Sequence, residues 1–152
     1  MREPPGADWT FFGKHRHRFE APDLYFVNMR GDVSAEDMQA QLEALGSLGR
    51  RSQCGIFWLC DVRDMGALTQ EARRAAAGAS KGELRSVLRG SAVFGAAFST
   101  RVVITLLVRA VRLLNPSKLR PLAFVETEAE ARAFLVQNGQ GKRSSLFPQV
   151  EI

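Results

Sequence analysis

The chain has 152 residues, a formal net charge of +5 and a sequence pI of about 9.9. Hydrophobic residues make up 45% and charged residues 24%, a balance that excludes an intrinsically disordered chain and allows one domain with a real core. The most apolar window, Val102–Leu114, is too short and too interrupted by Arg109 and Arg112 to span a bilayer, and no signal peptide is visible. We therefore expect a cytoplasmic protein.

The first third of the chain predicts an arm, a hairpin and a helix. Residues 1–14 are rich in proline and glycine and are expected to form a flexible N-terminal arm. Two strands, 15–20 and 24–29, are expected to form an antiparallel hairpin. Ser34 and Asp37 then have the spacing of a capping box, which indicates the start of a helix with apolar residues at helical spacing.

After this helix, strands alternate with helices. Residues 55–61 form a continuous apolar run, typical of a central strand buried on both faces, and a loop is expected to follow it. The later elements are a helix capped by Thr69 and running to residue 79, a strand over 91–98, a helix over 100–114, a strand over 122–125 and a helix capped by Thr127 and ending at residues 138–139.

This element order predicts an α/β fold with a mixed five-stranded sheet, an initial antiparallel hairpin and four helices. We assign residues 15–139 to the domain and residues 140–152 to a polar C-terminal tail.

Four segments resemble the SpoIIAA-like proteins of the STAS superfamily, the group that includes anti-sigma-factor antagonists. They are the hairpin, Gly–Asp turn and capped helix of residues 19–38, the DVRDMGALTQEARR segment of 61–74, the SAVFG strand of 91–95, and residues 121–135. The resemblance covers roughly residues 17–137. It implies a regulatory or binding module in a family whose members have been discussed as ligand-binding and membrane-associating proteins.

One departure from the family pattern concerns phosphorylation. In anti-sigma-factor antagonists a phosphorylatable Ser follows an Asp just before a helix. The corresponding region here contains no Asp–Ser pair, and Thr69 is the only nearby hydroxyl. Because helix capping is a sufficient explanation for Thr69, the resemblance does not extend to kinase-switched partner binding.

The sequence contains no recognisable catalytic or metal-binding signature. His15 and His17 share one face of a predicted strand without a nearby third ligand, and we interpret them as part of a solvated basic patch. Cys54 and Cys60 lack CxxC spacing and are expected to be free thiols. We therefore expect no enzymatic activity, no metal and no cofactor.

Asp61, Arg63, Asp64 and Thr69 follow the predicted central strand, at the edge where open α/β sheets bind ligands. One interpretation is a plain loop in which the Asp side chains cap local amides and pair with Arg63. The other is a loop that contacts a ligand or a partner protein.

Residues 84–125 contain no Asp or Glu and carry a charge of +7, so the rest of the chain is net acidic. Inside this stretch, Arg101, Arg109 and Arg112 fall on one narrow stripe of the predicted helix, and nearly all other positions are apolar. A helix packed on one side of a sheet needs an apolar stripe of only about 100°. The helix is therefore more apolar than a sheet alone requires.

Three interpretations of this helix stay open. The first is deep burial, with the Arg head groups reaching water; the second is an apolar ridge at an anionic membrane surface; the third is a cavity wall or a dimer face. We expect a stripe that includes Val102 and Leu106 to face the sheet, which leaves Ile104, Val108 and Val111 on a neighbouring face.

From these observations we expect a non-enzymatic regulatory module that attaches peripherally to an anionic membrane or binds a small apolar-anionic ligand. The expected contact residues are Arg101, Ile104, Val108, Arg109, Val111, Arg112, Lys118 and Arg120. The alternative is a protein–protein adaptor in a signalling pathway, with a homodimer also open. Nucleic acid is disfavoured as a partner because no aromatic residue lies between Arg101 and Arg120.

Overall fold

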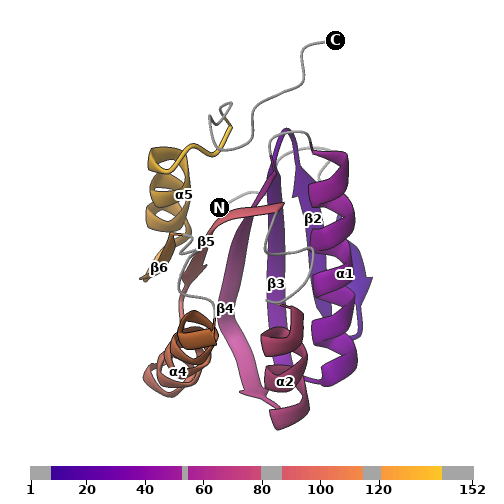
Figure 1. Ribbon diagram of the computed structural model, residues 1–152, viewed down its shortest axis with the longest axis vertical. Coiled ribbons are helices and arrows are strands. Elements are labelled where there is room, and N and C mark those ends of the chain that lie inside the picture. The colour runs from indigo at the N-terminus through magenta and orange to yellow at the C-terminus, as the bar shows by residue number, and fades with distance from the viewer. Residues whose placement is uncertain (1–7, 53–54, 80–86, 115–120, 142–152) are drawn as a thin grey trace.

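The computed structural model describes residues 8–52, 55–79, 87–114 and 121–141 (Figure 1). Within these ranges one sheet has six strands in the order β1-β2-β3-β4-β5-β6. Its first part is antiparallel and consists of β1 (Thr10–Phe12), β2 (His15–Glu20) and β3 (Leu24–Val33). The remaining strands run parallel to β3 and are β4 (Ile56–Leu68), β5 (Leu88–Phe94) and β6 (Leu122–Val125).

Helices lie on both faces of this sheet. They are α1 (Ala35–Arg51), α2 (Gln70–Ala79), α4 (Phe98–Leu114) and α5 (Glu128–Gln137). Within the described ranges, the predicted α/β class, initial hairpin and four helices are confirmed, and the sheet has one strand more than expected.

The core consists of two apolar layers, one on each side of the central strands. On β3, Tyr25 and Val27 pack in the layer under α1 and α2, whereas Leu24 and Phe26 pack in the layer under α5. Figure 1 shows α1 and α2 together on the near side of the sheet. Because successive strand residues point to opposite faces, a strand covered on both sides must be apolar at nearly every position.

The helix starts follow the predicted caps. Ser34 Oγ accepts a hydrogen bond from the Asp37 amide at 3.1 Å, and the Asp37 carboxylate accepts one from the Ser34 amide at 3.0 Å. Thr69 Oγ1 accepts from the Ala72 amide at 3.1 Å, and Thr127 Oγ1 accepts from the Glu130 amide at 3.2 Å. The capping predictions are therefore confirmed for α1, α2 and α5.

The predicted flexible arm is wrong for its last residues. Residues 10–12 form β1, which pairs with β2 around a turn in which Gly13 has a φ of +60°. Trp9 packs edge-on against Phe26, with ring centroids 5.4 Å apart. Residues 9–12 are therefore ordered, because β2 supplies backbone partners and the sheet supplies an aromatic surface.

The predicted loop after residue 61 is also wrong, because β4 continues to Leu68. Its extension pairs with the second half of β3, where Arg30 lies opposite Asp64 and Val33 opposite Leu68, with register shifts in between. The next strand lies earlier than expected, at 88–94 instead of 91–98, and Gly95 with a φ of +78° follows its end.

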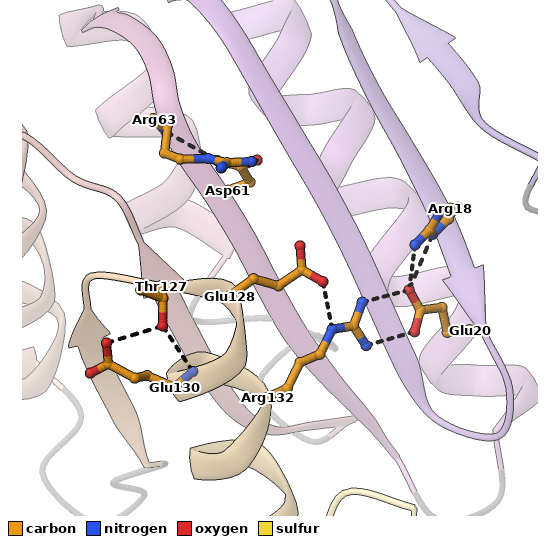
Figure 2. Close-up of polar contacts among 8 residues, drawn as sticks. All are labelled: Arg18, Glu20, Asp61, Arg63, Thr127, Glu128, Glu130 and Arg132. Atoms are coloured by element: carbon orange, nitrogen blue, oxygen red, sulfur yellow. Dashed lines mark hydrogen bonds and ion pairs between the residues drawn. The ribbon is translucent and has the colours of Figure 1, made fainter. Parts of the chain in front are cut away.

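An ion-pair network attaches α5 to the hairpin (Figure 2). Arg132 on α5 donates two hydrogen bonds to Glu20 on β2, at 2.8 and 2.9 Å, and a third to Glu128 at 2.9 Å. Glu20 also pairs with Arg18 at 3.0 Å. The network joins residues 112 positions apart in sequence and closes the layer that contains Phe26.

A second, fully buried ion pair lies where β3 and β5 begin. Asp23 accepts a hydrogen bond from Arg89 at 3.3 Å, and both side chains are buried. Asp23 also accepts from Gln140 and from the Gly141 amide, and Arg89 donates to the Gly139 carbonyl. The pair thereby holds the chain that leaves α5 against the start of the sheet.

Replacing Asp23 by Ala removes a buried carboxylate that accepts hydrogen bonds from Arg89, Gln140 and the Gly141 amide, so we expect Asp23→Ala to lower the free energy of unfolding by about 3–5 kcal/mol. Urea denaturation checks this, with Asp64→Ala as the control because Asp64 is exposed. Equal losses in the two variants would contradict the role given to the buried pair.

The network around Glu20 predicts a pH dependence. Hydrogen bonds from Arg132 hold the pKa of Glu20 below its ordinary value, although partial burial opposes this shift. A carboxylate with a depressed folded-state pKa contributes stability above its unfolded-state pKa and loses that contribution as pH falls through the folded value.

We therefore expect Glu20→Gln to cost about 1 kcal/mol of unfolding free energy near pH 7 and less near pH 3. Urea denaturation at the two pH values measures the difference. Glu43→Gln is the control, since Glu43 is exposed on α1. A deficit of Glu20→Gln that stays constant with pH would show that the ion pair is not its cause.

Candidate functional site

Helix α4 presents an apolar stripe to solvent. Phe98 is 83% exposed, Val102 41% and Leu106 59%, and their spacing places them on one face of the helix. Half of the large apolar side chains that are exposed in the described part of the chain lie on this helix. An exposed row of this kind marks a surface for a partner, a ligand or a membrane.

Arginine lies beside this stripe. Arg109 is exposed and follows Leu106 by three positions, which puts it on the same side of the helix. Arg101 is half-buried, and its Nε has no hydrogen-bond partner in the described structure. No acidic residue stands in the first turn of α4. The exposed side of α4 is therefore apolar and cationic.

The face prediction for this helix is wrong. Val102 and Leu106 were expected against the sheet, but both are exposed, whereas Ile104 is partly buried. Figure 1 shows the reason, since α4 stands beside α2 at the end of the sheet instead of lying flat across its face. Part of α4 is therefore covered by another helix instead of by the sheet. For this reason the buried side of α4 differs from the side that the sequence predicted.

Five of the predicted contact residues cannot be placed. The side chains of Val108, Val111 and Arg112 lie outside the described structure, as do residues 118 and 120 altogether. Their contact with a membrane or ligand remains a prediction. Phe98 was not predicted as a contact residue, because the helix was expected to begin after it; its position next to the predicted start was the available signal.

A shallow pocket of about 340 Å³ opens next to the start of α4. Its lining comes from the carboxyl ends of β5 and β6 and the first turns of α4, namely Gly95, Ala96, Phe98, Arg101, Val125 and Glu126. This is the edge at which open α/β sheets bind ligands. In the described structure no ion pair joins Arg101 to Glu126 across the pocket, so each charge faces it separately.

The four residues of the predicted ligand loop do not form one site. Asp61 is buried and pairs with Arg63, which donates from Nε at 3.0 Å and from Nη2 at 2.8 Å (Figure 2). This hydrogen-bonded pair raises the pKa of Arg63. Asp64 is exposed, and Thr69 caps α2. The extension of β4 separates these residues, whereas a loop would have gathered them.

Sequence reasoning missed Asn28 as a partner of Asp61. The Asn28 amide donates to Asp61 at 2.9 Å, and the two residues lie opposite each other on β3 and β4. A polar residue inside an otherwise apolar strand was the available signal. It could not be matched with Asp61, because the register between two strands joined by a helix is not visible in the sequence.

The predicted solvated histidine patch is wrong for His15. Its side chain is 1% exposed, with Nδ1 accepting from the Arg30 amide at 2.9 Å and Nε2 lying 3.1 Å from the Asp37 carboxylate. His17 contacts the Tyr25 hydroxyl. Helix α1 covers this face of β2 and brings Asp37 to His15, which a strand pattern alone does not show.

Cys60 is a free, buried cysteine as predicted, and burial raises the pKa of its thiol. Cys54 lies outside the described residues. Among the residues that the structure describes, no three His, Cys, Asp or Glu side chains gather as a metal site would require. No helix within those ranges has the length and hydropathy needed to cross a bilayer.

Comparison with known proteins identifies the fold. No protein-family model and no curated protein sequence matches the chain. Among solved structures it is similar to an uncharacterized protein of the DUF3478 family from Shewanella loihica PV-4, which is described as having a SpoIIAA-like fold. The two share 17% sequence identity with a TM-score of 0.53, over 89% of this chain and 98% of the other. The chain therefore has a SpoIIAA-like fold, as the sequence resemblance predicted.

Proposed function

We propose that this protein is a non-enzymatic regulatory module that attaches reversibly to anionic membrane surfaces through α4. The observation that carries the proposal is the exposed row of Phe98, Val102 and Leu106 on a helix with no acidic residue in its first turn. An amphipathic helix with apolar residues flanked by Arg lies in the interface plane of a membrane. Such a surface attracts anionic lipid in preference to neutral lipid.

The energies involved favour reversible attachment. Full burial of one Phe or Leu side chain contributes about 1.5–3 kcal/mol, and each basic residue near an anionic surface about 1 kcal/mol. Phe98, Leu106 and Arg109 together therefore supply enough free energy for binding at high lipid concentration. They do not supply the near-permanent anchoring of a spanning helix.

The second candidate for binding at this end of the sheet is a small ligand with an acidic head group and an apolar tail. The lining of the pocket beside α4 includes a cationic residue, Arg101, and an apolar one, Phe98. Glu126 on the same pocket opposes an anion there and therefore favours the membrane proposal over the small ligand. Competition by soluble amphiphiles in the vesicle assay separates the two.

Co-sedimentation with vesicles tests the membrane proposal. We expect the protein to pellet with phosphatidylglycerol-containing vesicles and much less with pure phosphatidylcholine, and the double variant Phe98→Ser/Leu106→Ser to bind at least about tenfold more weakly. Val136→Ser is the matched control, because Val136 is 48% exposed on α5. Equal pelleting with both vesicle types, or no pelleting with either type, would contradict the proposal.

Charge reversal tests the cationic side of α4. Arg109→Glu is expected to weaken binding to anionic vesicles roughly fivefold or more, because it removes one attraction and adds one repulsion. Arg51→Glu changes the net charge of the protein equally, but Arg51 is exposed at the far end of α1. If both variants lose the same affinity, net charge alone drives binding and α4 is not the contact surface.

A further inference from the structure

Three arginines from three neighbouring strands converge at one point on the sheet. Arg16 lies on β2, Arg30 on β3 and Arg63 on β4. They meet at the side chains of Asn28 and Asp61, which are 6% and 3% exposed. We call these five residues the arginine cluster. None of its residues belongs to the exposed stripe of α4 on which the proposed attachment to membranes rests.

Asn28 organises the cluster. Its Nδ2 donates to Asp61 at 2.9 Å, which determines the orientation of the amide. Its Oδ1 consequently faces outward and accepts from Arg16 Nε at 3.2 Å and from Arg30 Nε at 2.8 Å. Two guanidinium cations therefore share one neutral oxygen atom. Like charges brought this close repel each other unless a counter-charge lies nearby.

Asp61 does not supply that counter-charge to Arg30. Its two oxygens accept from the Arg63 amide, from Arg63 Nε and Nη2, and from Asn28. A carboxylate has about four acceptor positions, so Asp61 is saturated. Within the described residues, Arg30 has no carboxylate within ion-pair distance.

Two further carboxylates, Asp64 and Glu128, act electrostatically on the cluster at Arg63. Asp64 lies opposite Arg30 in the strand register, but no ion pair joins them in the described structure. Glu128 pairs with Arg132 at 2.9 Å, and Arg63 is already paired with Asp61. The positive charge of the cluster that has no ion pair in the described structure is therefore that of Arg30, which is exposed beside the exposed Arg63.

The exposed guanidinium of Arg63 is held in place. Its stem crosses Gly95, where a Cβ would lie 2.1 Å from Arg63 Cγ, and its Cζ lies 5.4 Å from the centroid of the Phe94 ring. Arg16 is positioned in a similar way, with its Cζ 4.1 Å from the Trp9 ring. Positioned guanidiniums lose less conformational entropy when they bind an anion than free surface side chains do.

We propose that the arginine cluster is a binding site for a phosphate group. Guanidinium forks match the oxygens of phosphates and carboxylates. The donors here come from side chains on three strands and approach from different directions, which a tetrahedral phosphate satisfies better than a planar carboxylate. The bound group accepts from the outer Nη atoms of Arg30 and Arg63, while Asn28 and Asp61 hold the two guanidiniums apart.

Titration with inorganic phosphate tests the site. The readout is the set of arginine Nε–Hε NMR signals of the full chain, recorded at constant ionic strength, with acetate as the planar comparison anion. We expect saturable shifts of the Arg30 and Arg63 signals with phosphate and at least several-fold weaker binding of acetate. Arg30→Gln is expected to weaken phosphate binding roughly tenfold.

The matched control is Arg51→Gln, which removes the same charge from an exposed site on α1 and is expected to leave phosphate binding unchanged within about twofold. Arg30 is the deciding position because it is exposed and forms no ion pair with another described residue, so its replacement leaves no described carboxylate without its partner. A second variant, Arg63→Lys, preserves the charge but removes the fork, and should also weaken binding.

A parallel titration with phosphatidylglycerol vesicles distinguishes a soluble phosphate compound from a lipid headgroup as the source of the phosphate. If soluble phosphate shifts the cluster signals and vesicles do not, the ligand is a soluble phosphate compound; if vesicles shift them and phosphate competes, it is a lipid headgroup. Shifts that do not saturate, or equal weakening in Arg30→Gln and Arg51→Gln, would overturn the proposal. Loss of vesicle binding in the α4 variants with the phosphate shifts intact would affect only the membrane proposal.

Discussion

The parallel pairing of β3 with β4 runs from Leu24 opposite Phe57 to Val33 opposite Leu68, and the other elements are attached to it. Both strands are buried on both faces over most of this length, so each needs a helical layer above and below. Helices α1 and α2 supply one layer and α5 the other. The hairpin strand β2 and the parallel strand β5 then extend the sheet on either side.

This pairing also determines where polar chemistry is possible. Asn28 and Asp61 are the positions at which the apolar pattern of the two central strands is interrupted on the same face, directly opposite each other. A buried carboxylate requires hydrogen-bond partners, and Arg63 and Asn28 provide them. The arginines that gather around this pair do so because their strands flank it.

Helix α4 is held differently from the other helices. It starts just beyond β5 and lies beside α2, so that only part of its apolar circumference is covered. The cost of leaving Phe98 and Leu106 in water is tolerated in a protein only where a surface is used or where packing offers no alternative. Residues 84–125, which include the helix, contain no Asp or Glu, so an anionic partner suits that surface best.

Local hydrogen bonds and periodicity made much of the fold predictable. The caps at Ser34, Thr69 and Thr127 depend on residues three positions apart, so they could be identified without tertiary information. The hairpin and the apolar run of β4 were predictable for the same reason. The strand β1 and the second half of β4 were not, because both exist only through backbone partners supplied by distant residues.

The candidate sites show the same division between features that depend on local sequence and features that depend on tertiary contacts. The sequence by itself determined the order of the elements after β1, the helix caps and the free Cys60, and it gave the pairing of Asp61 with Arg63 as one of two interpretations, because each depends on neighbours a few residues away or on composition. Only the tertiary structure decided which face of α4 is exposed, that His15 is buried against Asp37, and that Asn28 lies against Asp61. Those outcomes depend on which element covers which face, and the free energy that selects the covering element comes from packing between segments distant in the chain.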